Sequence, residues 1–135
     1  MSSSVAFVTL VVRNDTEEDK VKLDRVINYL RDNDGRGITL TPGNEGIVAS
    51  GYFDAAYGIH EDGKSHTGAC LTVGNRGPVS VESTKQSIVT KSSTEAELVA
   101  TSDSANMLLH LRNFLTAQGH PQGPSTVYQD NMSCM

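Results

Sequence analysis

Tryptophan is absent from this chain of 135 residues, aromatic residues make up only 5% of it, and cysteine occurs twice. Cys70 and Cys134 form no Cys-x-x-Cys pair and have no histidines at zinc-ligand spacing. This pattern excludes a disulfide framework and a structural zinc site. Two free thiols are typical of a reducing compartment, so we expect an intracellular protein, cytoplasmic or nuclear, rather than a secreted one.

Long apolar stretches are absent as well. The run Val5–Val12 has no basic segment before it and no small-residue cleavage site after it, as a signal peptide would, and it is far too short to cross a bilayer. We therefore predict a buried helix or strand at this place and no membrane partner.

Positive charge is scarce, because 11 Lys and Arg face 16 Asp and Glu and the net charge is −5. Domains that hold nucleic acid by bulk electrostatics are usually basic on at least one face. A role with nucleic acid would therefore need metal ions or a neighbouring segment. The length suits a single domain with a sizeable core.

A helix is predicted near the start of the chain. Thr16 offers a capping hydroxyl and is followed by three acidic residues, which the helix dipole favours in the first turn. An apolar face follows at spacings of three and four, formed by Leu23, Val26, Ile27 and Leu30. We expect this helix over Thr16–Leu30, then a short strand at Gly37–Leu40 and a turn at Thr41–Gly46.

The sequence pattern in the middle of the chain is typical of antiparallel strands separated by short turns. Strand candidates are the segments IVASGYFDAAYG, HTGACLTVG, PVSVEST and QSIVTK, over residues 47–58, 66–74, 78–84 and 86–91. The longest helical pattern then runs from Ser92 to Gln118, with Gly119 and Pro121 as stop signals. A final strand candidate, TVYQD, covers Thr126–Asp130.

Two glutamates at the start of that long helix have different tasks. Ser92 to Glu95 fits a capping box, in which Glu95 reaches back to the N–H of the capping residue. Glu97 lies roughly 200° further around the helix and heads a different stripe, made of Ala100, Ser104, Leu108, Leu111 and Leu115. A glutamate heading a buried stripe is desolvated, so it either extends to solvent at the helix end or binds something positive.

Two aspartates stand at comparable places. Asp54 shares one strand face with Tyr52 and Ala56 by alternation, and Asp130 ends the last strand candidate. The carboxyl end of a strand is a common place for a site in an α/β sheet. Solvated strand ends are the other explanation for both residues, since the chain contains 16 acidic residues.

The sequences of three segments resemble the ribonuclease H region of copia-type retrotransposon polyproteins. These segments are YFDAAYGIHEDGKSHTGACLTVG, STKQSIVTKSSTEAEL and VYQDNMS, and the Ser-Ser-Thr-Glu-Ala-Glu block is the most specific of their motifs. The stretch NDTEEDKVKLDRVINYLRDNDGRGITL resembles the connection that follows the reverse transcriptase in the same polyproteins. The resemblance implies a connecting helical segment at residues 1–35 and a ribonuclease H-like domain, lacking its C-terminal part, at residues 36–135.

This resemblance implies an α/β fold with a ribonuclease H-like mixed sheet, in which antiparallel hairpin strands and one parallel strand accompany a long crossing helix and one N-terminal helix. It assigns metal-binding and catalytic roles to Asp54, Glu97 and Asp130, with two Mg²⁺ ions that Mn²⁺ can replace. The expected activity is hydrolysis of the RNA strand of RNA/DNA hybrids, recognised by 2′-hydroxyls. Expected partners are the hybrid and the reverse transcriptase and integrase portions of the polyprotein, and retroelement particles are among the expected locations.

The sequence also departs from the family pattern. Ala56 and Tyr57 stand where the family often has an acid and a tryptophan, and the family continues past the Asp-Asn motif to a fourth metal-site residue that is not in this sequence. A catalytically inactive, truncated remnant serving as a structural or interaction module is therefore the alternative. A phosphoryl-accepting receiver-like domain using Asp54 would need parallel strands from the start, which the hairpin texture disfavours.

Other candidates have simpler explanations. His60 and His66 flank the acidic turn EDG and are expected to be solvated rather than metal ligands. GNRGP lacks the spacing of a nucleotide-binding loop and is expected to be a hairpin turn. Cations that could contact a nucleic-acid backbone, or simply occupy solvated strand ends, are Lys64, Arg76, Lys85 and Lys91.

Overall fold

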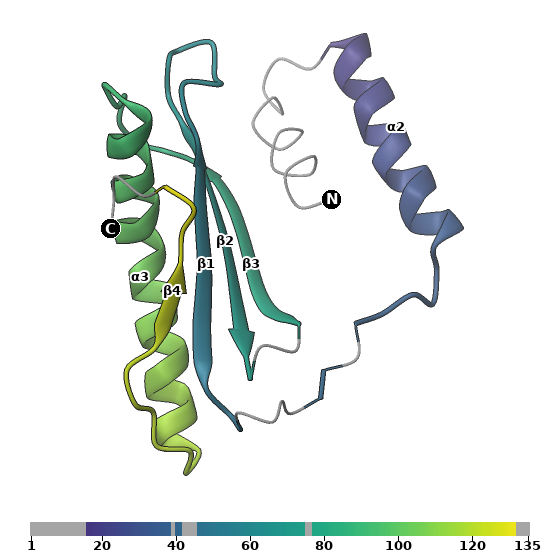
Figure 1. Cartoon of the computed structure of the whole chain (residues 1–135). Helices are drawn as coiled ribbons and strands as arrows, with labels where there is room; N and C mark the ends of the chain where they lie inside the picture. The colour runs from purple at the N-terminus through teal and green to yellow at the C-terminus, as the bar shows by residue number, and fades with distance from the viewer. Residues whose placement is uncertain (1–15, 39, 42–45, 75–76, 132–135) are drawn as a thin grey trace. The chain divides into compact units, whose positions relative to one another are not determined.

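The structure is a computed structural model that describes residues 16–38, 40–41, 46–74 and 77–131. The chain divides into two compact units, Met1–Ile38 and Thr39–Met135. Each unit is considered by itself (Figure 1). No helix in the described ranges is long and apolar enough to cross a membrane.

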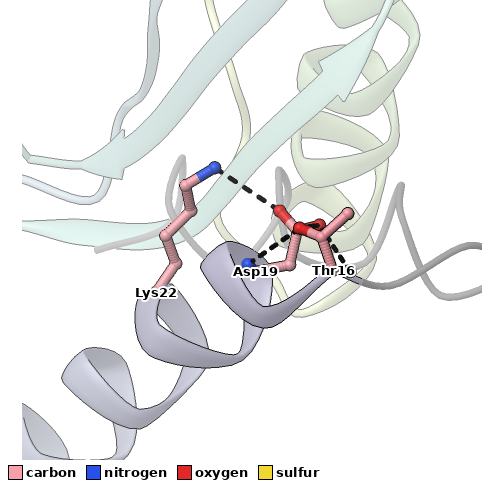
Figure 2. Close-up of polar contacts among 3 residues, drawn as sticks. All are labelled: Thr16, Asp19 and Lys22. Carbon is pink, nitrogen blue, oxygen red and sulfur yellow. Dashed lines mark hydrogen bonds and ion pairs between the residues drawn. The ribbon is translucent and has the colours of Figure 1, made fainter.

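The first unit contains helix α2, Glu17–Asp32, which begins as its sequence predicts. The Asp19 N–H donates to Thr16 Oγ1 at 3.3 Å, and the Thr16 N–H donates back to Asp19 Oδ2 at 3.1 Å. Lys22 Nζ lies 3.4 Å from Asp19 Oδ1, and Figure 2 shows the three side chains together. The predicted helix is confirmed and extends to Asp32, with Asn33 as its C-cap. This capping box satisfies backbone donors that have no partner inside the helix.

The second unit has a mixed α/β architecture, which is compatible with a ribonuclease H-like fold. The described residues form a four-stranded sheet of order β3-β2-β1-β4. Its strands are β1 Ala49–Ala56, β2 His66–Val73, β3 Pro78–Lys85 and β4 Thr126–Tyr128. The first three pair antiparallel, whereas β4 pairs parallel with β1 (Figure 1). Parallel neighbours need a crossover connection, and here it contains the long helix α3, Ser93–Ala117.

Helix α3 covers one face of the sheet and forms the core with it (Figure 1). Its buried residues follow most of the predicted stripe, with small side chains near the N-terminus and leucines further on: Glu97, Ala100, Ser104, Leu108 and Leu115. Ala96 is buried in addition, and Leu111 of the stripe is only partly buried. Leu108 and Leu115 form one core cluster with four buried residues from the strands, Ala49, Phe53, Ala69 and Leu71. Small residues at the start of the helix let its backbone approach the sheet closely, which places the first turn of α3 against the strands.

One close approach explains a glycine inside β1. A Cβ atom at Gly51 would lie 2.7 Å from Cζ and 2.8 Å from Cε1 of Phe53. The Phe53 ring therefore occupies the space that a side chain at position 51 would need. Since Phe53 is itself buried in the core, glycine is required here by packing.

Two predicted strands are wrong. Gly37, Ile38 and Leu40 belong to no strand, and Thr39 is outside the described residues. Residues 86–91 are all described and are irregular. The Gln86 N–H still donates to the Ser65 carbonyl at 2.9 Å, and its side chain donates to Thr67 Oγ1 at 3.1 Å and to the Ala96 carbonyl at 2.9 Å. The side-chain bonds tie the start of the segment to β2 and to the first turn of α3, so tertiary contacts rather than the β-propensity of its apolar residues decide its conformation.

Some predicted features lie wholly or partly outside the described residues. These are the apolar run Val5–Val12, most of the turn at Thr41–Gly46 and the tip of the GNRGP turn at residues 75–76. Gly74 and Gly77, which border that tip, have φ values of 64° and 118°, as expected where a hairpin reverses.

Candidate metal centre

The two parallel strands place Asp54 and Asp130 at the same end of the sheet. The pairs Ser50↔Thr126, Gly51↔Val127 and Tyr52↔Tyr128 fix the register. Continuing this register by two residues sets Asp130 opposite Asp54. Asp130 does not end the strand as predicted, since β4 stops at Tyr128 and Asp130 follows in the chain beyond it.

The stacked rings of Tyr52 and Tyr128 support this register immediately before the two aspartates. Their centroids are 4.5 Å apart and their planes differ by 13°. A cross-strand aromatic pair of this kind stabilises the pairing of a short strand. It therefore helps to keep Asp130 beside Asp54 even though β4 is only three residues long.

The third carboxylate comes from helix α3. Glu97 is 5% exposed and lies in the buried stripe, as its helical phase predicts. One ligand oxygen from each of Asp54, Glu97 and Asp130 lies within 4.8 Å of the others. We call these three residues the acidic triad, and the structure brings together all three acids that the sequence singled out.

Gln129, which sequence reasoning missed, holds the buried member of the triad. Its Nε2 donates to Glu97 Oε2 at 3.0 Å and to the Glu97 carbonyl at 3.3 Å. A buried carboxylate needs such a partner, since leaving it without hydrogen bonds costs free energy. No periodic signal marks Gln129 in the sequence, because β4 is only three residues long and ends before it.

The chemistry of the triad is that of a site for a hard divalent cation. Three carboxylates supply only oxygen ligands, which Mg²⁺ and Mn²⁺ prefer. Asp54 and Asp130 are exposed, so solvent or a substrate can reach the same position. Asp54 also accepts a hydrogen bond at Oδ1 from the Ala55 N–H at 2.9 Å, which orients its carboxylate. The arrangement could therefore hold a metal ion.

Glu95 has the separate, structural task that was predicted, with one difference in detail. Its N–H donates to Ser92 Oγ at 3.1 Å, so Ser92 caps the helix. Its carboxylate accepts from the N–H of Lys91 at 2.6 Å rather than from that of Ser92. Both glutamates thus have partners, but only Glu97 belongs to the triad.

The prediction of solvated turn histidines is wrong. His66 is only 6% exposed, and its Nδ1 lies 3.1 Å from His60 Nε2. Burial lowers the pKa of both imidazoles, and the nearby Lys85 ammonium lowers the pKa of His60 further. Although His66 was expected at the start of a strand, the pair was missed because the path of the connecting segment, which brings His60 back to His66, is not encoded in their spacing.

Two of the predicted cations are tied to a neighbouring acid. Lys85 Nζ lies 2.8 Å from Asp62 Oδ2, and Lys64 Nζ lies 3.9 Å from the same oxygen. The hydrogen bond with Lys85 holds the pKa of Asp62 below its usual value.

Burial raises the pKa of the free thiol of Cys70, as expected for an unreactive cysteine.

Comparisons with known proteins give three relatives. The chain is 29% identical, over 100% of its own length, to the retrovirus-related Pol polyprotein from transposon TNT 1-94 of Nicotiana tabacum. It is 33% identical, over 87% of its length, to each of the retrovirus-related Pol polyproteins from transposons RE1 and RE2 of Arabidopsis thaliana. No protein-family model and no solved structure matches the chain.

These relatives are much longer than the chain, which spans 10% of the first and 8% of each of the other two. The similarity thus extends over most or all of this chain but over only a short part of each relative. The homologues of the chain are retrovirus-related Pol polyproteins from plant transposons.

Proposed function

We propose that this chain is the ribonuclease H region of a retrotransposon Pol polyprotein and hydrolyses the RNA strand of RNA/DNA hybrids in a metal-dependent reaction. The convergence of Asp54, Glu97 and Asp130 within 4.8 Å is the observation that carries the proposal. The names of the relatives support the polyprotein context. In this proposal residues 36–135 are the nuclease domain, and residues 1–35 connect it to a preceding reverse transcriptase.

The residues present fit Mg²⁺, with Mn²⁺ as its substitute. Carboxylates this close repel one another, so the triad is stabilised when positive charge lies among them. Every ligand atom in the triad is an oxygen, as hard cations require. Divalent ions bound there supply a Lewis acid that activates water and stabilises the departing 3′ oxygen.

The protein's own contribution is positioning. Asp54 and Asp130 are held side by side by the parallel register, and Glu97 is held by burial and by Gln129. The phosphodiester of the RNA strand approaches from the exposed side, where Asp54 and Asp130 are open. The net charge of −5 does not favour the hybrid, so binding depends on metal ions or on other portions of the polyprotein, among which we include the integrase.

A cleavage assay with matched variants tests the proposal. A labelled RNA/DNA hybrid is incubated with Mg²⁺ and the chain, or with its Asp54→Asn or Glu97→Gln variant. Removing an outer partner of a metal ligand typically costs about 10- to 100-fold in activity, so losing a ligand should cost at least about 100-fold. Glu95→Gln is the control, since it makes the same charge change two residues away on the same helix and should keep the rate.

Gln129→Ala gives a finer test of positioning. We expect hybrid cleavage to fall by about 10- to 100-fold, with the loss partly recovered at high Mg²⁺ concentration, because Glu97 keeps its carboxylate but loses the donor that orients it. Rescue by metal distinguishes a positioning role from loss of the fold, which extra Mg²⁺ would not repair.

Two results would contradict the nuclease. One is a rate for the chain equal to that of buffer with Mg²⁺, combined with no binding of Mn²⁺ to the triad in nuclear magnetic resonance. The other is equal cleavage by the chain and by Asp54→Asn. The first result would favour a silent module that keeps the fold for structural or interaction purposes.

A further inference from the structure

The acidic triad contains three pairs of carboxylates, and two of these pairs are fixed by contacts within the sheet or beside it. The parallel register of β1 and β4 fixes Asp54 relative to Asp130. The Gln129 side chain bonds to Glu97 and so fixes Glu97 relative to Asp130, the residue that follows Gln129. The third pair, Glu97 and Asp54, joins helix α3 to the antiparallel part of the sheet.

The side chain of Gln86 bridges the elements that carry this third pair. Gln86 is 2% exposed, and its Nε2 donates to Thr67 Oγ1 at 3.1 Å and to the Ala96 carbonyl at 2.9 Å. Thr67 lies on β2 next to the residue that pairs with Asp54. Ala96 precedes Glu97 on α3. One amide group therefore contacts the immediate neighbours of two triad elements.

The acceptors around Gln86 set the orientation of its amide. Both protons of Nε2 are donated, whereas Oε1 is buried and has no partner among the described residues. The reversed amide would place Oε1 against the Ala96 carbonyl oxygen, and two acceptors repel each other. A buried oxygen without a partner costs free energy, which an apolar side chain would avoid. The two donated bonds are thus the specific contribution of Gln86.

The backbone of Gln86 is anchored as well. Its N–H donates at 2.9 Å to the carbonyl of Ser65, which is fully buried and directly precedes β2. Because both its backbone and its side chain are held by the β2 region, Gln86 cannot follow a displacement of α3. The bond to Ala96 therefore holds the first turn of α3 at a fixed distance from β2.

We propose that Gln86 is a positioning residue for the acidic triad, which holds the first turn of α3 where Glu97 and Asp54 can bind the same cation. This inference rests on the proposed metal-dependent function of the triad. Gln86 acts through the Ala96 carbonyl and not on the cation itself. Ligands of a working site must be held within about 0.5 Å of their productive positions, so a small shift of the turn weakens metal binding.

Two substitutions in the same buried cluster test the proposal. Gln86→Met keeps the length of the side chain and removes both donated bonds. Thr90→Val is the matched control, because the Thr90 hydroxyl is bonded at 3.0 Å to Ser65 Oγ instead of to α3. Both variants should be less stable than the wild type, but only Gln86→Met should move Glu97.

The first measurement needs neither metal nor cleavage. The side-chain amide signals of Gln129 in nuclear magnetic resonance report the bonds that its Nε2 donates to Glu97. In metal-free buffer, the ¹H and ¹⁵N chemical shifts of this amide should change in Gln86→Met and remain at their wild-type values in Thr90→Val.

The second measurement is metal dependence. Gln86→Met should weaken Mn²⁺ binding to the triad by about tenfold, at the lower end of the range for residues that support a metal ligand. The Mg²⁺ concentration for half-maximal hybrid cleavage should rise by a similar factor, while the KM for the hybrid stays at its wild-type value. Thr90→Val should leave the Mg²⁺ dependence unchanged, since lower stability alone reduces only the amount of folded protein.

Thr67→Val decides the question where Gln86→Met does not fold. It removes only the anchor of Gln86 on β2, so the Gln129 signals should change in the same direction by a smaller amount. Unchanged Gln129 signals in Gln86→Met, or in Thr67→Val if the first variant is unfolded, overturn the proposal. Changes of equal size in Thr90→Val also overturn it, because Gln129 would then report a general loosening of the fold.

The two measurements also separate this proposal from the proposed function. If the wild-type chain binds no Mn²⁺, the metal-dependent function fails, and the Gln129 signals still decide whether Gln86 positions Glu97. If the wild type binds Mn²⁺ and Gln86→Met binds it equally well, the function stands and the positioning role is overturned.

Discussion

Helices α2 and α3 have similar N-terminal sequences but differ in how deeply their side chains are buried. Each has a hydroxyl residue at its N-cap that accepts from the backbone three residues on. The first turn contains three acidic side chains in α2 and one, Glu95, in α3. Yet α2, all of whose residues are described, has none that is buried, whereas α3 has six. Local sequence signals therefore set where both helices start, but burial depends on whether a partner surface exists.

This difference matters for the candidate site. Glu97 can be fixed in place because it belongs to a helix that is packed along the sheet, and Gln129 holds it there. A glutamate on α2 would have no such surroundings, since Leu23 and Ile27 of its apolar face remain exposed. Packing is thus what turns an ordinary acidic side chain into a positioned ligand.

The largest contrast is expected from removing one leucine from each helix. Leu108→Ala in α3 should lower the free energy of unfolding of the second unit by about 2–5 kcal/mol, because it leaves a cavity in the core. Leu23→Ala in α2 should change the free energy of unfolding by no more than about 0.5 kcal/mol, since Leu23 is exposed. Urea unfolding followed by amide exchange in β1 and β2 measures both, and equal losses would contradict the comparison.

A smaller effect is expected where the sheet meets α3. Gly51→Ala places a Cβ within 2.8 Å of two atoms of the Phe53 ring, so the ring must shift within the core. Overpacking of this kind should cost about 1–3 kcal/mol. Gly37→Ala, at a position with open space around the added atom, is the control. A stable Gly51→Ala variant with an unchanged Phe53 ring environment in nuclear magnetic resonance would show that the Phe53 ring leaves room for a Cβ atom at position 51.

Removing either N-cap side chain should lower stability by a smaller and similar amount. The two substitutions should affect parts of the chain of different size. Thr16→Ala and Ser92→Ala each remove a side-chain acceptor, which typically costs about 1 kcal/mol. Because α3 is part of the core, Ser92→Ala should lower the stability of the whole second unit. Thr16→Ala should instead reduce only the helicity of α2. Residue-resolved amide exchange distinguishes these outcomes, and a loss confined to the first turn of α3 would refute the first of them.

The smallest effect is expected from acid titration in metal-free buffer. The pKa values of His60 and His66 are lowered in the folded chain, so their neutral forms are favoured and the stability of the second unit should be full above pH 6.5 and decline as pH falls toward the lowered values. The pKa of Asp19 is lowered by its bonds to Thr16, so the cap of α2 should persist to below pH 3.8. Far- and near-ultraviolet circular dichroism against pH reports both, and a His66→Gln variant with the same midpoint would contradict the first.

Several features of the site followed from the sequence alone. The helical phase of Glu97 relative to Ala100, Ser104 and Leu108 predicted that it heads the inward stripe and that Glu95 would not share its task. The phase left open whether the Glu97 carboxylate extends to solvent, and the structure buries it. The mixed sheet was also predicted, since short breaks imply antiparallel neighbours and a long helix implies a crossover.

Other features could not be obtained in this way. Gln86 and Gln129 are polar residues without a periodic signal, and their roles depend on carbonyl and side-chain partners far along the chain. The closeness of His60 to His66 depends on the path of a hairpin that the sequence limits in length but not in shape. The segment at residues 86–91 has strand-forming composition but is irregular, and the side chain of Gln86 connects its start to β2 and α3.

Local sequence patterns set where both helices begin, where they end to within two residues, and which side of α3 faces inward. These are local properties, fixed by capping chemistry and by the 3.6-residue period of the helix. Tertiary structure alone decided that the acids meet within 4.8 Å, that Gln129 supports one of them, and that two histidines face each other. Such distances arise from strand register and from side-chain packing between distant segments, and no local pattern encodes them.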